Sequence, residues 1–224
     1  MARLRKAARI WRNPAAQALA LRVTIAQDAP VFTVDPAMLF QREAPIEIEL
    51  GAGKGDFIIE RAASMPERNF LAIELSGSVA RMLAVRAGQS ESGNLRVLRA
   101  DARTVVNLLL PDASVAAYHI YFPDPWPKER HAKHRLFTPH FADSLKRTLC
   151  AGGGRVFVAT DVGDYARGIF PILEAAGFAR VDEPVPGSDR SNFGRKYLEA
   201  GRRVFQGAFG FPPLRLARDR GTLL

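Results

Sequence analysis

The stretch YFPDPWPKERHAKHR, residues 121–135, places one carboxylate between two prolines and follows it with a dense run of basic residues. Pro123 and Pro125 fix their own φ angles and restrict the residues before them, so Asp124 is held on a stiff loop. A carboxylate held in this way can be aimed at a substrate. Four basic side chains follow at close spacing: Lys128, Arg130, Lys133 and Arg135. Their charge would neutralise the phosphates of a nucleic acid that passes the carboxylate.

Three further carboxylates lie at the ends of short apolar runs that have the composition of buried strands. Glu49 lies in PIEIEL, Glu74 follows NFLAI, and Asp101 follows NLRVLRA. Ligands of open α/β sheets bind beyond the carboxyl ends of the strands, so we expect these acids at one rim. Glu74 can accept two hydrogen bonds from ribose hydroxyls, and Asp101 would lie near an adenine edge. The acidic rim favours a cationic ligand that carries adenosine, and S-adenosylmethionine, a sulfonium without phosphate, fits it.

A glycine-rich turn follows the first of these strands. In ELGAGKGD, residues 49–56, Gly51, Gly53 and Gly55 would let the backbone turn tightly and approach a ligand closely. The spacing is G-x-G-x-G, whereas a dinucleotide-binding turn prefers G-x-G-x-x-G and binds a pyrophosphate at a helix N-terminus. The acidic Asp56 that follows disfavours a pyrophosphate, so a nicotinamide oxidoreductase is a poor match. A plain tight turn without a ligand is the alternative.

Segments with strand and helix patterns alternate through the middle of the chain. Strands are expected at 46–50, 69–75, 94–101, 115–122 and 155–161, with helices between them. A helix after the glycines places Phe57, Ile58 and Ala62 on one face, and Thr138 is the expected N-cap of a later helix. Pro171 is expected to kink or break the last helix. The alternation predicts a doubly wound, mostly parallel α/β sheet, with RRVFQGAF as an antiparallel last strand.

Both ends of the chain lack this alternation. Residues 1–44 are predicted to form a basic N-terminal arm with one short helix, either a loosely packed tail or a segment that touches RNA. Residues 211–224 are predicted to form an exposed basic C-terminal tail. A single domain over residues 45–210 remains, and its length is sufficient for one sizeable core.

The composition favours a polyanionic partner. There are 32 Lys and Arg against 23 Asp and Glu, a formal net charge of +9, so nucleic acid is the leading partner class and a merely basic enzyme the alternative. The single cysteine, Cys150, excludes an internal disulfide and a cysteine-rich zinc site, and we expect it to serve packing. No apolar run approaches the roughly 20 residues of a membrane span. We therefore expect a cytoplasmic protein without a membrane segment or metal, and monomer and homodimer both stay open.

Five motifs, taken in order, resemble those of one enzyme family. ELGAGKG, AIEL, RADA, YFPDPWPKERHAKHRL and ATD are similar in order and spacing to the motifs of the tRNA (guanine-N7) methyltransferases, a family of class I S-adenosylmethionine-dependent methyltransferases. The similarity covers residues 46–205, and the proline-braced motif carries most of its specificity. The resemblance implies a seven-stranded Rossmann-like sheet and transfer of a methyl group from S-adenosylmethionine to N7 of guanine in tRNA, with the variable-loop guanine as the expected target.

The resemblance also implies roles for individual residues. Cofactor binding is implied for seven of them: Glu49, Gly51, Gly53, Gly55, Glu74, Asp101 and Asp124. Substrate binding is implied for five: Lys128, Asp161, Ser191, Asn192 and Phe193. Asp124 is in addition the expected catalytic residue, because its carboxylate can accept hydrogen bonds from guanine N1–H and the exocyclic amine. Trp126 offers a stacking face for a base, or else anchors the loop.

One motif departs from the family pattern. Members of the family have Thr-x-Phe/Tyr-Glu before the last strand, whereas this chain has RSNFGRK. Ser191 keeps the hydroxyl, but Gly194 stands where an acid is expected. The departure leaves the recognition of the base open: Arg195 or Glu199 would have to compensate, or the target nucleotide differs.

Two other functions therefore remain as alternatives. The chain could methylate another RNA or another atom, although amino-group methyltransferases tend to use N/D-P-P-F/Y/W, and Asp124-Pro125-Trp126 lacks the second proline. It could also be a non-catalytic RNA-binding relative that keeps the pocket and has lost turnover, which Gly194 permits.

Overall fold

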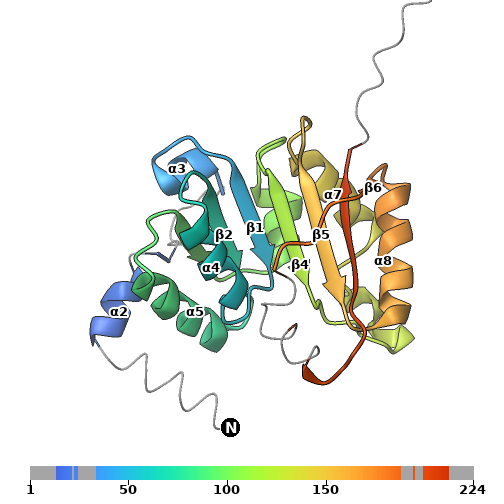
Figure 1. Ribbon diagram of the computed structural model, residues 1–224, viewed down its shortest axis with the longest axis horizontal. Helices are drawn as coiled ribbons and strands as arrows, with labels where there is room; N and C mark the ends of the chain where they lie inside the picture. Colours follow the sequence, from blue (N-terminus) through green and yellow to red (C-terminus); the bar gives the residue numbers. More distant parts are fainter. Residues whose placement is uncertain (1–13, 22, 25–33, 188–193, 195–198, 212–224) are drawn as a thin grey trace, which may run out of the picture.

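The computed structural model describes residues 14–21, 23–24, 34–187, 194 and 199–211. Within them the strands form one seven-stranded sheet in the order β3-β2-β1-β4-β5-β7-β6 (Figure 1). The strand bounds are β1 (Ile46–Leu50), β2 (Asn69–Ile73), β3 (Leu95–Leu98), β4 (Ala117–Tyr121), β5 (Arg155–Thr160), β6 (Ala179–Val181) and β7 (Phe205–Gly210). β7 is antiparallel to both of its neighbours, and the other six strands run in one direction. The predicted fold class is confirmed.

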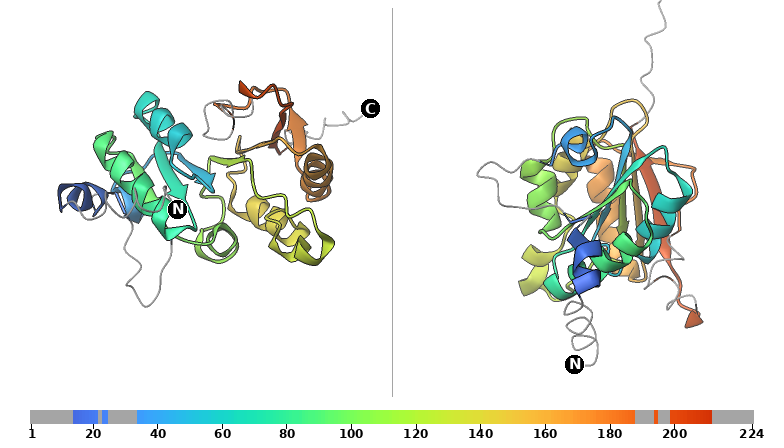
Figure 2. Two further views of the ribbon diagram at one scale, coloured as in Figure 1. Left: turned by 90° about the horizontal axis from the view of Figure 1, so that it is seen from below. Right: turned by 90° about the vertical axis from the view of Figure 1, so that its left-hand side faces the viewer.

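Helices cover both faces of the sheet (Figure 2). α4 (Asp56–Ser64) and α5 (Gly77–Gln89) pack over the β1, β2 and β3 half of one face. On the opposite face the sheet packs against the π-helical turn η1 (Val105–Leu109), α7 (Pro139–Thr148) and α8 (Gly163–Ala175), among other segments. The short α6 (Ala102–Thr104) leads directly into η1. None of the helices in these described ranges is long and apolar enough to cross a membrane.

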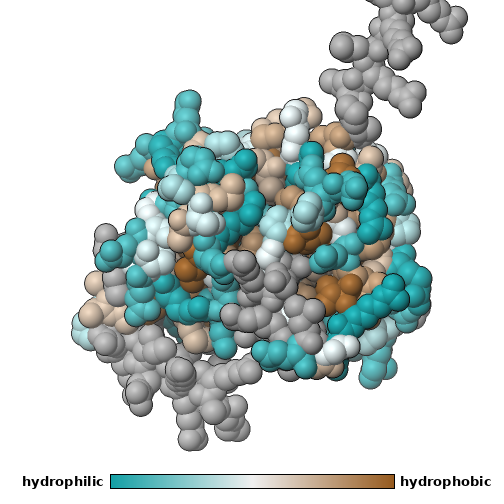
Figure 3. Space-filling model, viewed as in Figure 1, coloured by the Kyte–Doolittle hydropathy of each residue, from teal (hydrophilic) through white to brown (hydrophobic). Residues whose placement is uncertain are grey.

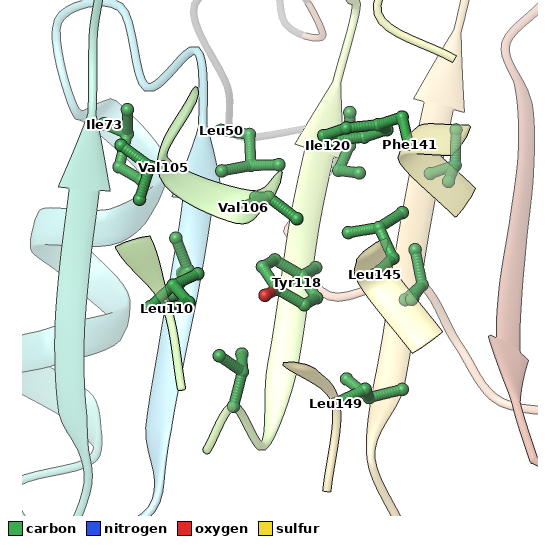
Figure 4. Close-up of a cluster of buried hydrophobic side chains, with 14 of the residues drawn as sticks. Leu50, Ile73, Val105, Val106, Leu110, Tyr118, Ile120, Phe141, Leu145 and Leu149 are labelled. Atoms are coloured by element: carbon green, nitrogen blue, oxygen red, sulfur yellow. The ribbon is translucent and has the colours of Figure 1, made fainter. Parts of the chain in front are cut away.

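The main core lies between the sheet and the face formed by η1 and α7. Figure 4 shows Tyr118 and Ile120 of β4 pointing toward Val106 of η1 and Leu145 of α7. On β1 the odd and even positions divide between the two faces, because successive side chains of a strand point to opposite sides. Ile46, Ile48 and Leu50 enter this core, so the glutamates between them face α4. On the molecular face in Figure 3, hydrophobic side chains are confined to small areas.

The caps and breaks of two helices test the sequence predictions. α7 begins as predicted, since the Thr138 hydroxyl accepts a hydrogen bond from the Phe141 amide at 3.2 Å. α8 continues through Pro171, so the alternative of a break there is wrong. Ile169 and Leu173 lie on either side of this proline and are fully buried. The free energy gained by burying these two side chains outweighs the loss of the backbone hydrogen bond that the proline cannot make.

The described part of the N-terminal arm packs on the domain and contains two helices, where one was predicted. α2 (Pro14–Leu21) lies against α5, and α3 (Pro36–Phe40) precedes β1. Between them the carbonyl of Val23 accepts a hydrogen bond from the amide of Val97 at the outer edge of β3 (2.8 Å). Val34 is fully buried in the main core. A loosely packed tail is therefore wrong for these residues.

Candidate active site

The parallel strands run toward the lower edge of the sheet in Figure 1, and a cavity of about 550 Å³ lies at their carboxyl ends. Its lining contains every residue predicted to bind the cofactor except Gly55: Glu49, Gly51, Gly53, Glu74, Asp101 and Asp124. These residues come from the ends of four different strands. The acids that were predicted at one rim of the sheet therefore line one cavity.

The glycine turn connects β1 to α4 in a conformation that requires glycine. Gly51, Gly53 and Gly55 have φ angles of 76°, 57° and 75°, a region in which a residue with a Cβ is strained. The Gly51 amide donates to the carbonyl of Ile73 on β2 at 2.9 Å, which ties the turn to the neighbouring strand. A Cβ on Gly55 would lie 2.1 Å from a methyl of Leu83. Gly55 thus lets α4 pack against α5, whereas the first two glycines face the cavity.

Glu49 is a buried carboxyl with one oxygen that lacks a partner. The residue is 4% exposed, and Oε2 makes no hydrogen bond. Burial raises the pKa of Glu49 well above its usual value, and the neighbouring carboxylates of Asp56 and Glu74 raise it further, while a hydrogen bond from the Ile58 amide opposes them. A buried oxygen without a partner on a cavity wall is a site where a ligand can donate.

Glu74 is held by backbone amides on both sides. Its Oε2 accepts a hydrogen bond from the Gly53 amide at 3.0 Å, and its Oε1 accepts one from the Ser76 amide at 2.7 Å. Each carboxylate oxygen has a second lone pair, so Glu74 can still accept from a ligand. The side chain is fixed before any ligand arrives, and it connects the glycine turn to the start of α5.

Asp101 has a local structural role in addition to its place on the cavity wall. Its Oδ1 accepts hydrogen bonds from the amides of Arg103 (2.7 Å) and Thr104 (3.3 Å), so it is the N-cap of α6. Burial raises the pKa of Asp101, but the hydrogen bonds from Arg103 and Thr104 outweigh it and lower the pKa below its usual value. The carboxylate is therefore a fixed anion at the end of β3.

Asp124 lies three residues after the end of β4, on the loop between the two prolines. The loop is more constrained than the prolines alone predict, because Phe122 and Trp126 have φ angles of 50° and 41°. Such conformations cost of order 1–3 kcal/mol for a non-glycine residue and are concentrated at functional sites. The Phe122 amide donates to the carbonyl of Ala159 on β5 at 2.7 Å and fixes the start of the loop. The carboxylate of Asp124 is exposed at the cavity.

Trp126 lines the cavity and is 37% exposed, so it is not a core residue. The ring of His134 lies 5.0 Å from it and that of His131 5.7 Å, both from the 3₁₀ helix η2 (Glu129–His134). Arg135 donates to the Trp126 carbonyl at 3.1 Å. The indole thus contacts two imidazole rings and stays partly open to solvent, so part of it is available to a base.

Of the predicted substrate residues that the structure describes, Lys128 and Asp161 lie outside the cavity lining. Lys128 is exposed on the loop after Asp124. Asp161 follows β5, its side chain is 11% exposed, and it forms an ion pair with Arg202 at 3.0 Å. Arg202 precedes β7, and the sequence did not single it out.

Most of the motif that departs from the family pattern lies outside the residues that the structure describes. Ser191, Asn192, Phe193 and Arg195 lie outside the described residues, so their predicted roles are untested. Gly194 is buried, and Glu199 is exposed. In the described ranges no group of three or more His, Cys, Asp or Glu side chains could hold a metal ion.

The sequence reasoning missed the apolar part of the wall. Leu75, Val79 and Met82 line the cavity beside Glu74, and Tyr121 and Leu136 line it beside Asp124. Leu75 is 63% exposed and forms part of this apolar wall. The helical spacing of Val79 and Met82 was a usable signal, since both follow the predicted strand end by one or two turns.

Comparisons with known proteins agree with this geometry. A family described as "Putative methyltransferase" matches residues 43–206. A tRNA (guanine-N(7)-)-methyltransferase of Psychromonas ingrahamii is 41% identical over 64% of this chain and 58% of its own length. One of Syntrophotalea carbinolica is 36% identical over 76% and 75%.

Solved structures add support for the fold alone. The 30S ribosomal A1408 methyltransferase from an uncultured bacterium has a TM-score of 0.58 at 13% identity, over 85% of this chain and 99% of its own. The 16S rRNA methyltransferase KamB has a TM-score of 0.57 at 19% identity, over 84% and 96%. Because the sequence motifs, the family match over residues 43–206 and the relative covered over 75% of its own length agree, the chain belongs to the tRNA (guanine-N(7)-)-methyltransferase family.

Proposed function

We propose that this protein transfers a methyl group from S-adenosylmethionine to N7 of a guanine in tRNA, with the variable-loop guanine as target. The observation that carries the proposal is the shared cavity: Asp124, on its proline-braced loop, lines the same space as Glu49, Glu74 and Asp101. A nucleophile guided by Asp124 would therefore meet a ligand held by the other three acids. The reaction takes place in the cytoplasm, and it needs no metal.

The residues present fit S-adenosylmethionine. The acidic wall suits a cation, the unpartnered oxygen of Glu49 can receive a donor from the ligand, and Gly51 and Gly53 leave room for close approach of the backbone. Glu74 would accept from the ribose hydroxyls and Asp101 would lie at the adenine edge. When bound, the cofactor supplies an electrophilic methyl group on a sulfonium.

The protein has no proton to remove from the nucleophile, because N7 of guanine carries an in-plane lone pair. Its contribution is to position the base and to stabilise charge. Asp124 accepts hydrogen bonds from guanine N1–H and the exocyclic amine, and the nearby carboxylates stabilise the positive charge that grows on the purine. Trp126 stacks on the displaced base, a contact worth about 1–3 kcal/mol.

The basic segment after Asp124 binds the RNA backbone. Lys128 and Arg130 are exposed beside the cavity mouth, and the net charge of +9 favours a polyanion. Asp161, Ser191, Asn192 and Phe193 contribute to recognition of the target nucleotide. Binding of this kind weakens steeply as the salt concentration rises.

The test is to incubate the protein with bulk tRNA and methyl-labelled cofactor and to identify the labelled nucleoside by mass spectrometry. We expect 7-methylguanosine. A different labelled nucleoside would show that the protein acts on another atom. No labelled nucleoside, with S-adenosylhomocysteine still bound in a calorimetric titration, would identify a non-catalytic relative.

A further inference from the structure

The glycine turn between β1 and α4 is held from two sides. On one side, residues 51–53 donate their backbone amides to the end of β2, two to the Ile73 carbonyl and one to the Glu74 carboxylate. On the other side, the carbonyl of Lys54 accepts a hydrogen bond from Nη1 of Arg86, a residue of α5, at 2.6 Å. The methyl transfer itself makes no use of Arg86, so this second contact calls for a separate explanation.

The same nitrogen of Arg86 also contacts a carboxylate. It lies 2.6 Å from Oδ1 of Asp56, the first residue of α4. The Asp56 side chain is 11% exposed and that of Arg86 39%, so the pair is partly shielded from solvent. A terminal guanidinium nitrogen carries two protons, which is enough to donate to both acceptors. One side chain of α5 thus joins the end of the glycine turn to the start of α4.

Arg86 connects two walls of the cavity. Gly53 and Lys54 belong to the wall formed by the glycine turn, and Val79 and Met82 belong to the wall formed by α5. Arg86 itself lies outside the lining, but it follows Met82 by four residues and therefore lies on the same side of the helix. Figures 1 and 2 both show α4 and α5 side by side. The contact of Arg86 with the turn therefore fixes the position of one wall relative to the other.

A turn rich in glycine benefits from such a contact. Glycine loses more conformational freedom on folding than any other residue, and three of the five residues 51–55 are glycines. Leu83 of α5 already lies against Gly55, and Arg86 adds a polar contact one turn further along the helix. A turn that is fixed before the ligand arrives avoids the cost of ordering on binding.

Arg86 also acts on the charge of the cavity wall. Burial is the largest cause of the raised pKa of Glu49, and the charge of Asp56 is the second, so Asp56 acts electrostatically on this wall. Arg86 opposes that charge. Removal of Arg86 would leave the wall more negative, which by itself favours a cationic ligand such as S-adenosylmethionine. A charge effect and a positional effect of Arg86 therefore have opposite consequences for cofactor affinity.

We propose that Arg86 is a positioning residue for the cofactor, which fixes the glycine turn against α5 by donating to the Lys54 carbonyl and the Asp56 carboxylate. The inference rests on the proposed function, because it takes the cavity as the site of S-adenosylmethionine. Since Arg86 lies outside the cavity lining, it acts through the backbone of the turn. Its loss should weaken cofactor binding by displacing that backbone.

The test compares Arg86→Met with Arg147→Met. Both changes remove an arginine that donates to a carbonyl and a carboxylate, and the two wild-type side chains are 39% and 35% exposed. Arg147 of α7 contacts Asp112 and the carbonyl of Val106 in η1, away from the cavity lining.

Calorimetric titration measures the expected difference between these variants. For Arg86→Met the Kd values of S-adenosylmethionine and S-adenosylhomocysteine should both rise about two- to tenfold, the effect of one lost hydrogen bond, while those of Arg147→Met stay within about twofold. Thermal unfolding should show lower stability for both variants. A purely structural role of Arg86 would lower stability without changing either Kd.

Two further measurements sharpen the test. Arg86→Lys keeps a charge and a donor, so its Kd values should lie closer to wild type than those of Arg86→Met. Hydrogen exchange of residues 53–57 should be faster in Arg86→Met than in wild type and unchanged in Arg147→Met. Arg86→Gln, a milder change, carries the same expectations as Arg86→Met and replaces it if that variant does not fold.

The outcomes distinguish this inference from the proposed function. A wild-type protein that binds neither S-adenosylmethionine nor S-adenosylhomocysteine contradicts the proposed function, whatever the variants do. A wild type that binds both, with unchanged Kd values in Arg86→Met or with tighter binding of S-adenosylmethionine, overturns the positioning role of Arg86. An equal loss of affinity in Arg147→Met overturns it as well, because the effect would then follow from lower stability.

Discussion

Glu47 and Glu49 lie two residues apart on β1 and point to the same face of the sheet, yet their surroundings give the two carboxyls opposite properties. Glu47 contacts Arg61, Arg68 and His119, and these contacts outweigh burial and lower its pKa to about 2. Glu49 lies beside other acids and keeps one oxygen without a partner, and its pKa is raised. Identical residue types in one strand thus divide into a structural anion and a ligand-facing acid.

This difference shows where to look for function in the fold. A buried carboxylate that is paired within the protein stabilises the fold. A buried carboxylate without a partner in the protein is a candidate for binding a ligand. The paired region consists of Glu47 on β1 and its contacts, and it continues through His119 of β4 to Tyr121. The ligand-facing region lies at the strand ends and continues to Asp124. Substitutions in the two regions should therefore have separable effects on stability and on activity.

The largest effect is expected at the reacting end of the ligand-facing region. Asp124→Asn should lower kcat by about 100-fold or more, because the amide presents a donor where guanine also donates. Stability should hardly change, since Asp124 is exposed. Single-turnover methylation of tRNA and thermal unfolding measure both. Asp143→Asn, an exposed change on α7, is the control. Turnover by Asp124→Asn at the level of this control would remove Asp124 from the catalytic role.

In the paired region the effect should fall on stability. Glu47→Gln should lower the free energy of unfolding by about 3 kcal/mol at neutral pH, since the pKa of Glu47 is lowered from 4.5 to about 2. For a lowered pKa the stabilisation is present above pH 4.5 and is lost as the pH falls toward 2. Urea unfolding at several pH values measures it.

The neighbouring Glu67→Gln is the matched control for that change. The Glu67 side chain is 64% exposed and lies 3.9 Å from Arg68, so its removal should change stability little. Equal stability of the two variants would contradict the assignment of Glu47 as a structural anion.

Glu49→Gln should change the free energy of unfolding in the opposite direction from Glu47→Gln. The folded protein raises the pKa of Glu49, so this carboxyl favours folding only at pH values below its unfolded pKa and opposes folding as the pH rises. The variant should therefore be more stable than wild type at neutral pH and lose this advantage in acid. Its affinity for S-adenosylhomocysteine should fall about tenfold, the effect of one hydrogen bond to a charged group. Urea unfolding measures the stability and calorimetry the affinity. A Glu49→Gln variant that is less stable than wild type at neutral pH would refute the account of Glu49.

The smallest effect is expected outside both regions, on the basic loop. Lys128→Ala should weaken tRNA binding a few-fold and reduce the slope of log K against log salt by about 1, because one phosphate contact is lost. Lys146→Ala, on α7, removes an exposed lysine away from the cavity lining and should leave the slope unchanged. Filter binding at several salt concentrations measures this. Identical slopes for the two variants would exclude Lys128 from the RNA interface.

The sequence predicted the fold well where local patterns agree with tertiary packing. The glycine turn, the face of α4 formed by Phe57, Ile58 and Ala62, and the Thr138 cap are all as expected. β6 was missed because three residues, Ala179–Val181, carry too little pattern to be recognised. The sequence left open whether α8 breaks at Pro171, because the burial on both sides of the proline that favours its continuation is a tertiary effect.

The residues of the site also divide into those that the sequence predicts and those that only the structure shows. Acids at strand ends are visible in the sequence, because turns follow strands and the fold brings strand ends together. The difference between Glu47 and Glu49 is not visible, since it depends on Arg61 and Arg68 on one side and Asp56 on the other. The hydrogen bond from Arg86 to the Lys54 carbonyl joins residues 32 positions apart, and no local pattern indicates it.

The most direct test of the ligand-facing region is a crystal structure of the protein with S-adenosylhomocysteine. We expect the ligand in the cavity, with its adenosine between Glu74 and Asp101 and a donor within hydrogen-bond distance of Glu49 Oε2. A ligand bound elsewhere, or a Glu49 Oε2 that still lacks a partner in the complex, would contradict the account.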